Sequence, residues 1–216
     1  MKKLLILLFF SIQLFGQKTQ IYTLAKLHEQ GKLKYANRSA KVETTGNKSY
    51  IKLSDQQGEG LVWLPISSFK NGEIEIEMQG KDVFQRSFIG IAFHGLNDST
   101  YDAVYCRPFN FYAKDSIRKI HAIQYVSHPN YTWKKLREER NGQFEKEISN
   151  APDPNSWFKM KINVEDNLVK AYINNAINPS LIINKLNDRT NGKIGIFVGD
   201  NSDGNFSSIK VRNSKF

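Results

Sequence analysis

The chain has 216 residues, of which 31 are Lys or Arg and 21 are Asp or Glu, so its formal net charge is +10. Its one cysteine, Cys106, excludes an internal disulfide and argues against the small disulfide-stapled secreted classes. A basic balance is typical of proteins that bind nucleic acid or anionic polymers. Here the positive charges are scattered and the densest run, residues 134–140, is interleaved with acids, so we expect no nucleic-acid partner, while an anionic glycan stays open.

The first 16 residues are typical of a signal peptide. Lys2 and Lys3 form a basic start, and residues 4–15 are almost entirely apolar. That run is shorter than the about 20 residues that span a bilayer, and no second long apolar run follows. We expect residues 1–16 to be removed and residues 17–216 to be secreted or periplasmic, with no membrane association. An uncleaved anchor is the alternative.

Short strands recur along the rest of the chain, each bounded by turn-forming residues. The expected strands are residues 49–53, 61–64, 73–78, 87–94, 101–107, 157–164, 168–173, 193–198 and 206–211. Only residues 21–30 and 131–140 have a pattern that favours a helical turn or two. About ten strands of this kind predict an all-β, antiparallel two-sheet jelly-roll sandwich. We expect one domain over residues 17–216, and a monomer.

Two strands in the middle of the chain have unusual side chains on one face. On each strand the other face is apolar, because successive side chains point to opposite sides of a sheet. The unusual faces carry Gly90, Ala92 and His94 on the first strand and Ala103, Tyr105 and Arg107 on the second. Small residues leave space, and Tyr and Arg can fill its rim. The pattern therefore predicts a groove.

Several segments of the chain are similar to a known superfamily. They are residues 87–95, 101–111, 124–129, 131–133, 157, 161–164, 171–174, 192–196 and 203–206. Together they resemble exported bacterial domains of the concanavalin A-like lectin/glucanase superfamily, nearest to the 3-keto-disaccharide hydrolase-like domains, which are related in shape to laminin G modules. The resemblance covers roughly residues 60–211 and implies a concanavalin A-like sandwich, but a fold does not name a reaction. The Glu-x-Asp-x-x-Glu motif of the glucanases is not matched by residues 73–77, which argues against that type of enzyme.

The same central region holds the candidate ligand-binding residues. Sugars are recognised by flat aromatic rings against the apolar faces of pyranoses, and by planar polar groups against paired hydroxyls. Side chains of these types are Tyr105, Arg107, Asn110, Gln124, His128, Tyr131 and Trp133. We expect them to bind carbohydrate. The alternative is that Arg107 and Asn110 only tie down the loop at Pro108 and that Trp133 belongs to the core.

Candidate catalytic residues lie in three places. Cleavage of a glycosidic bond usually needs two carboxylates roughly 5–9 Å apart. Glu75 and Glu77 share a strand face at about 7 Å, although an outward face on a half-buried strand is the commoner cause of such a pattern. His94, which ends an apolar strand, and the nearby Asp98 and Asp102 are the other acid–base candidates.

The sequence leaves one cofactor open, a structural calcium ion. Asp200 and Asp203 lie in the Asx-rich loop 199–205 and offer the oxygen ligands that calcium prefers. The loop has only two acids and no closing Glu, so an ordinary turn is favoured. The four histidines lack the close spacing of a zinc site, which is not supported.

The sequence leaves three functions open. The first is an exported carbohydrate-active domain that binds a glycan in a concave groove. The second is a glycoside hydrolase that acts on 3-keto or other disaccharides or oligosaccharides. The third is a laminin G-like protein-interaction module. Planar polar and aromatic residues, rather than a large aliphatic patch, favour the first two.

Overall fold

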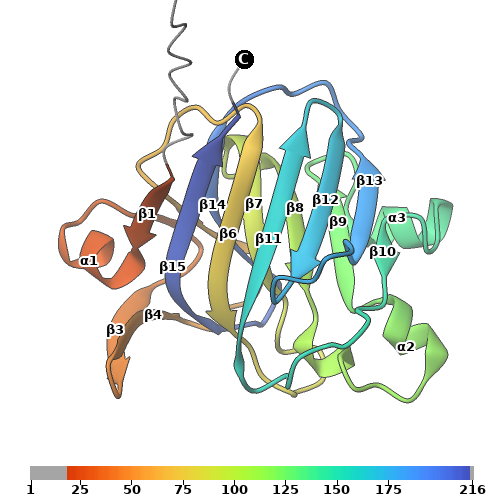
Figure 1. The fold of residues 1–216 in the computed structure, drawn as a ribbon, viewed down its shortest axis with the longest axis horizontal. Coiled ribbons are helices and arrows are strands. Elements are labelled where there is room, and N and C mark those ends of the chain that lie inside the picture. Colours follow the sequence, from red (N-terminus) through yellow and green to blue (C-terminus); the bar gives the residue numbers. More distant parts are fainter. Residues whose placement is uncertain (1–18, 215–216) are drawn as a thin grey trace, which may run out of the picture.

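The computed structural model describes residues 19–214, so the expected signal peptide over residues 1–16 lies outside the described residues. The strands form two antiparallel sheets packed face to face (Figure 1). A continuous cluster of buried apolar side chains joins the two sheets. The predicted all-β two-sheet sandwich is therefore confirmed.

The eight-stranded sheet carries the end of the chain in its middle. Strand β1 (Gln20–Thr23) pairs with β15 at one side of the sheet. The other strands follow the order β13 (Leu181–Asn184), β12 (Leu168–Ile173), β11 (Trp157–Glu165), β6 (Gly72–Gln79), β15 (Gly204–Asn213), β4 (Lys48–Leu53) and β3 (Ala40–Thr45).

The seven-stranded sheet lies behind it in Figure 1 and holds the central strands of the chain. Its order is β10 (Glu145–Lys146), β9 (Ile123–Ser127), β8 (Thr100–Cys106), β7 (Ile89–Asn97), β14 (Lys193–Val198), β5 (Gly60–Trp63) and β2 (Lys34–Ala36). The helices are α1 (Leu24–Glu29), the 3-10 turn η1 (Pro108–Asn110), α2 (Ser116–Ile120) and α3 (Trp133–Glu139). Helices α2 and α3 lie at the β10 edge of the sandwich (Figure 1).

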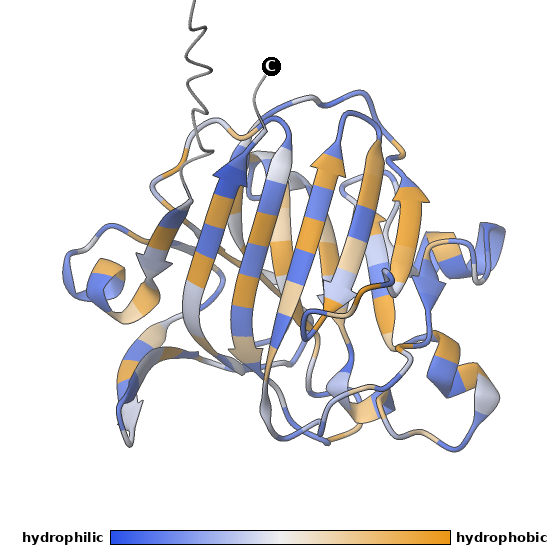
Figure 2. Cartoon of the chain, viewed as in Figure 1, coloured by the Kyte–Doolittle hydropathy of each residue, from blue (hydrophilic) through white to orange (hydrophobic). Residues whose placement is uncertain are grey.

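One face of the eight-stranded sheet is buried in the core, and the other faces solvent. Along β6, Ile74, Ile76 and Met78 are fully buried, while Glu75 and Glu77 point away from the core. Figure 2 shows the same alternation of hydrophobic and hydrophilic residues on the neighbouring strands. A strand with a period of two can bury only alternate side chains. The expected outward face of this strand is confirmed.

The seven-stranded sheet is buried on both faces. Cys106 points inward, with its Sγ 3.8 Å from Met160 Sδ of the opposite sheet. Tyr105 therefore points outward, where it meets its cross-strand neighbour Gln124. All five residues of β9 are nevertheless buried, so the outer face is covered by other segments. These covering segments build the site described below.

The small residues of the outer face allow close packing instead of leaving a hollow. A Cβ at Gly90 would lie 2.1 Å from Val104 O and 2.7 Å from Tyr105 Cβ. A Cβ at Gly195 would lie 2.7 Å from the Trp63 ring. The expectation that Gly90 leaves space for a groove is wrong, because that space is already filled. The hollow lies next to Tyr105.

Most elements lie where the sequence predicts them, and the two helical segments appear as α1 and α3. Helix α2, the turn η1 and strands β1, β2, β3, β9, β10 and β13 have no counterpart among the strands and helical segments expected from the sequence. Within residues 19–214, no helix is long and apolar enough to cross a membrane.

Candidate functional site

A pocket of about 760 Å³ lies on the outer face of the seven-stranded sheet, and we call it the outer pocket. Tyr105 and Phe197 form its floor, on β8 and β14. Its walls come from the loop before β7, the segment with η1 and α2, the start of α3, and the loop between β14 and β15. Its charged lining residues are Glu59, Arg86, Arg107, Arg118, Arg137 and Asp200.

Arg107 is fixed at the base of the outer pocket. Its Nη2 donates to the Tyr105 hydroxyl over 2.9 Å and also to Gln124 Oε1, and its Nη1 donates to His121 O over 2.7 Å. The Tyr105 hydroxyl donates to Gln124 Oε1 over 2.8 Å. Burial raises the pKa of Tyr105 to about 12 and lowers the pKa of Arg107. Tyr105 keeps its proton and Arg107 its charge at neutral pH, so both remain hydrogen-bond donors.

Glu145 is a buried carboxylate behind the same wall. Pairing of β10 with β9 places it opposite Gln124. It lies 2.7 Å from His121 Nδ1, 3.2 Å from Arg137 Nη2 and 3.6 Å from Arg107 Nη1. Burial lowers the pKa of His121 more than this carboxylate raises it. One carboxylate is thus the counter-charge of two guanidinium groups.

A second arginine is held in the wall by neutral partners. Arg118 Nε donates to Asn110 Oδ1 over 3.1 Å, and its Nη2 donates to Phe109 O over 2.7 Å. Asp115 caps α2 by accepting the Arg118 backbone N–H over 2.8 Å. The cap starts the helix so that its first turn brings Ile117 and Arg118 to the pocket.

The rim of the outer pocket carries exposed apolar side chains. Phe84 is 58% exposed, Ile117 65% and Trp133 45%. The Arg118 guanidinium carbon lies 4.8 Å from the centroid of the Phe84 ring, and that of Arg137 lies 5.4 Å from the Trp133 ring. Exposed rings beside fixed polar groups are the combination that recognises an amphipathic ring such as a sugar.

A smaller pocket of about 450 Å³ adjoins the outer pocket, and we call it the side pocket. Glu59 lines both pockets. Its Oε2 accepts from the Tyr101 hydroxyl over 2.8 Å and lies 3.3 Å from His128 Nε2. His128 stacks on Tyr101 with ring centroids 4.8 Å apart, and burial lowers its pKa. Asp98 also lines the side pocket and accepts from Trp63 Nε1 over 2.6 Å.

The structure brings most of the candidate binding residues to one place. Four of the seven line the outer pocket, namely Tyr105, Arg107, Asn110 and Trp133. Gln124 holds Tyr105 and Arg107 from beneath, and His128 lines the side pocket. Tyr131 packs against the core, lies under Lys135 and Arg140, and lines neither pocket.

The candidate catalytic carboxylates are not brought together. Glu75 and Glu77 lie on the outer face of the eight-stranded sheet, whereas both pockets lie on the seven-stranded sheet. Lys210 lies 3.1 Å from Glu75 and Lys48 lies 2.7 Å from Glu77, as expected for a solvated strand face. Neither carboxylate can reach a ligand in either pocket.

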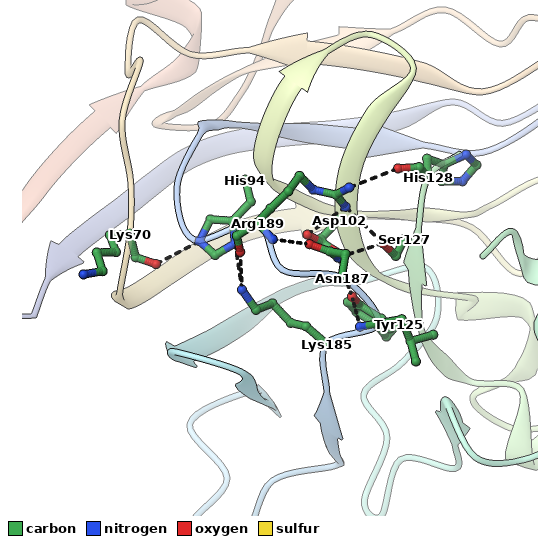
Figure 3. Close-up of polar contacts among 10 residues, drawn as sticks. Lys70, His94, Asp102, Tyr125, Ser127, His128, Lys185, Asn187 and Arg189 are labelled. Atoms are coloured by element: carbon green, nitrogen blue, oxygen red, sulfur yellow. Dashed lines mark hydrogen bonds and ion pairs between the residues drawn. The ribbon is translucent and has the colours of Figure 1, made fainter. Parts of the chain in front are cut away.

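Asp102 belongs to a buried polar network between the sheets (Figure 3). It accepts from the Tyr125 hydroxyl over 2.5 Å and from Asn187 Nδ2 over 2.6 Å, and it pairs with Arg189 at 3.0 Å. Asp102 points inward because it lies an even number of residues from the core residue Val104. These contacts anchor the loop after β13 to the end of the sandwich.

His94 lies in the same network, and it lines neither pocket (Figure 3). Its Nε2 is 2.8 Å from Lys70 O, and Lys185 Nζ is 3.4 Å from its Nδ1. Burial lowers its pKa to about 4. Strand alternation predicts an outer position for His94, but a register shift in β7 between Phe93 and Asn97, with a positive φ of 48° at His94, changes its direction.

The loop between β14 and β15 does not fit a calcium ion. Asp200 Oδ1 accepts from the Gly58 N–H over 2.6 Å, and its Oδ2 accepts from Asn201 Nδ2 over 2.9 Å. Asp203 Oδ1 lies 2.7 Å from Lys81 Nζ. Protein donors thus occupy the expected ligand oxygens. In the part of the chain that the structure describes, no three His, Cys, Asp or Glu residues form a metal-binding group.

Sequence reasoning missed residues that matter for the outer pocket. Arg137 lies in the basic run that was interpreted as solvated, and Glu145 lies in a strand of two residues, too short to show alternation. Arg118 and Phe84 lie in loop or short-helix segments, whose place over the sheet follows only from the fold. A signal was available for Arg118, because Asp115 precedes it at the spacing of a helix cap.

Known structures share this fold at low sequence identity. They include a protein of unknown function with a galectin-like fold from Bacillus subtilis (TM-score 0.61, 13% identity, 90% of this chain and 94% of that chain). A carbohydrate-binding module, CBM66 from Bacillus subtilis, matches with a TM-score of 0.54 and 13% identity over 84% of this chain and 92% of that chain. A native glycosidic hydrolase matches with a TM-score of 0.58 and 11% identity over 93% of this chain and 98% of that chain.

No protein-family model and no curated protein matches the chain. The structural likenesses show the fold, and they confirm the concanavalin A-like sandwich that the sequence resemblance implies.

Proposed function

We propose that the protein binds a glycan in the outer pocket. The observation that carries this proposal is the position of the Arg107 guanidinium at the floor, below the exposed Trp133 ring at the rim. A volume of about 760 Å³ lies within the roughly 300–1,000 Å³ typical of small-molecule sites. The pocket is therefore large enough for a short saccharide.

Trp133 and Arg107 would contact different parts of the sugar. The Trp133 ring covers the apolar face of one sugar ring, where buried apolar area and C–H contacts with the π-face favour binding. Three of the five N–H groups of Arg107 bind His121 O, the Tyr105 hydroxyl and Gln124 Oε1, so Nε and the second N–H of Nη1 are the donors that it can offer to sugar hydroxyls. Because Gln124 and His121 O fix that fork before binding, little side-chain entropy is lost when a sugar binds.

The comparisons support a role of this class without naming a ligand. A carbohydrate-binding module and a glycosidic hydrolase have the same fold as this chain. Because one fold hosts many functions, the residues of the outer pocket, rather than the fold, support glycan binding by this chain.

A binding panel tests the proposal. Immobilised neutral and acidic polysaccharides are incubated with the mature protein and with Trp133→Ala. We expect at least one polysaccharide to retain the parent protein and to retain Trp133→Ala far less. The matched control is Tyr172→Ala, an aromatic residue on the outer face of the eight-stranded sheet, which should bind as the parent does. Equal retention of the parent and Trp133→Ala would show that the outer pocket is not the glycan-binding site.

A second candidate function is hydrolysis of a glycosidic bond. The observation that favours it is that Glu59 lines both pockets, with Asp98 as a second carboxylate in the side pocket. A saccharide that extends from one pocket into the other would pass Glu59. Sugar release is scored in the same panel, and Glu59→Gln should retain binding and lose release. No release from any substrate would leave binding as the function.

We also propose that the protein acts outside the cytoplasm, because residues 1–16 have the composition of an export signal. Sequencing the N-terminus of protein expressed with its own leader should give a start near Gln17 in the periplasm or medium. A cytoplasmic protein that retains Met1 would contradict this.

A further inference from the structure

The charges around the outer pocket are unequal. Four arginines line it, namely Arg86, Arg107, Arg118 and Arg137, against two carboxylates, Glu59 and Asp200. The sign of the pocket depends on which of these charges are already matched by protein partners, because a neutralised charge contributes little field to a ligand.

The two carboxylates of the lining are occupied by protein donors. Glu59 Oε2 accepts from the Tyr101 hydroxyl and lies against His128 in the side pocket. Both oxygens of Asp200 accept hydrogen bonds, one from Gly58 and one from Asn201. Neither carboxylate forms an ion pair with an arginine of the outer pocket within residues 19–214. Because these donors are neutral, Glu59 and Asp200 keep their negative charges, although neither is directly paired with an arginine of the pocket.

The arginines, in contrast, are only partly neutralised. Glu145 is the counterion of both Arg107 and Arg137. Because it carries one negative charge, it leaves one of these two positive charges unmatched. Arg118 binds a side-chain amide and a backbone carbonyl, both neutral, and Arg86 is exposed. Among the described residues, neither Arg118 nor Arg86 lies in an ion pair. Four arginines against three carboxylates, namely Glu59, Asp200 and Glu145, leave one net positive charge around the pocket.

The geometry of two of these arginines also indicates an acceptor in the pocket. Arg118 lies over the Phe84 ring and Arg137 lies over the Trp133 ring. Nε and Nη2 of Arg118 already donate to Asn110 Oδ1 and Phe109 O, which leaves its Nη1 group as a charged donor for a ligand oxygen. Arg137 Nε is buried and has no hydrogen-bond partner. A buried donor without an acceptor is unfavourable, so an anionic group that reaches this N–H would be favoured.

We propose that the glycan bound in the outer pocket is acidic, with its anionic group against Arg118 and Arg137. The proposal rests on the proposed function and specifies its ligand class. A uronic-acid carboxylate and a sulfate ester share the required chemistry, since each offers several charged oxygens to planar donors. The neutral part of the sugar contacts the exposed rings of the rim.

A matched pair of probes tests the charge directly. Oligogalacturonate and its fully methyl-esterified form have the same sugar backbone and differ in the charge of the carboxyl groups. Affinities are measured by calorimetry at about 20 mM and about 300 mM NaCl, where screening lengths differ by several-fold. We expect the acid to bind at least about 10-fold more tightly than the ester at low salt, with a smaller difference at high salt. Sulfated and unsulfated galactan oligosaccharides distinguish sulfate from carboxylate as the anionic group.

Variants assign the selectivity to the wall. Arg118→Gln should lose about 10-fold in affinity for the acid and little for the ester, whereas Arg118→Lys should keep part of the selectivity. The control Arg212→Gln removes the same charge from the outer face of the eight-stranded sheet and should leave the ratio unchanged. Thermal melts of each variant confirm that it is folded.

The outcomes separate this inference from the proposed function. Equal affinity for acid and ester, with both lost in Trp133→Ala, would overturn the acidic ligand and keep the glycan site. Selectivity that survives in Arg118→Gln and Arg137→Gln would also overturn the assignment. Failure of every neutral and acidic glycan to bind would overturn both proposals.

Discussion

Gln124 lies directly opposite Tyr105 across β8 and β9, and the Tyr105 hydroxyl donates to its Oε1 over 2.8 Å. Both side chains are at most 3% exposed, although they are on the outer face of the sheet. The same amide oxygen accepts from Arg107. The floor of the outer pocket is therefore a fixed part of the fold, and its hydrogen-bond donors are oriented before any ligand arrives.

Substitution of Arg107 should affect stability before it affects binding. Arg107→Ala leaves Glu145 with less of its buried counter-charge and leaves His121 O with only the longer bond of 3.4 Å from Asn110 Nδ2. Breaking a buried, hydrogen-bonded charge pair costs about 3–5 kcal/mol. Urea unfolding should show a loss of that size. The surface variant Arg212→Ala, from an exposed ion pair, should lose about 1 kcal/mol or less. An Arg107→Ala protein as stable as the parent would show that the contacts of Arg107 with Glu145 and His121 O do not stabilise the fold.

Truncation of Trp133 should weaken binding and leave the fold intact. The Thr132 hydroxyl caps α3 and places Trp133 in its first turn, where 45% of the residue is exposed. Loss of one stacked ring costs about 0.5–1.5 kcal/mol beyond the buried area, so Trp133→Ala should bind about 10-fold more weakly. Trp133→Phe should recover part of this affinity. An unchanged Kd in calorimetry for Trp133→Ala would contradict stacking on this ring.

His94 should make stability depend on pH in the acidic range. Its pKa in the folded protein is about 4, below the ordinary value of 6.5, so the unfolded chain takes up the proton first as pH falls. Its contribution to stability is complete above pH about 6.5 and is lost as pH falls toward about 4, a change of up to about 3 kcal/mol.

The measurement is urea unfolding of the parent protein and of His94→Gln at several pH values between about 7 and about 4. Gln can still donate to Lys70 O but does not titrate. The difference in unfolding free energy between the two proteins should shrink as pH falls. Parallel pH profiles would show that His94 is not held neutral by the fold.

Calcium should not stabilise the protein. Lys81 pairs with Asp203, and Gly58 and Asn201 occupy both oxygens of Asp200. A calcium ion at about 100 times its Kd would add about 2.7 kcal/mol and raise the Tm by several degrees in a chain of this size. Melting curves in excess calcium and in EDTA should agree within about 1 °C. A rise of several degrees with calcium would mean that the loop binds the ion after all.

Strand alternation predicted the fold and the floor of the outer pocket, because it fixes which side chains of a strand share a face. The inward positions of Cys106 and the outward positions of Tyr105 and Arg107 follow from the period of two, and the structure has them there. Asp102 follows the same rule and points inward, which the sequence could have shown. His94 does not follow it, because a register shift cannot be read from one strand alone.

The walls of the outer pocket could not be predicted in the same way. Arg118 and Arg137 lie on short helices whose position over the sheet depends on long-range packing, and a charged helix face has the same pattern whether it borders solvent or a pocket. The pairing of Glu145 with Gln124 joins segments that no local pattern relates. Loops and short helices thus carry the part of the site that the sequence left open.

The indole N–H signals of the three tryptophans test the central claim most directly. Trp133 lines the outer pocket, Trp63 donates to Asp98 at the side pocket, and Trp157 lies under Lys48 on the outer face of the eight-stranded sheet. In a ¹⁵N-labelled protein titrated with a glycan from the panel, the Trp133 signal should shift with the Kd found by calorimetry, while the Trp157 signal stays in place. A glycan that binds and shifts Trp157 but not Trp133 would contradict the outer pocket as the binding site.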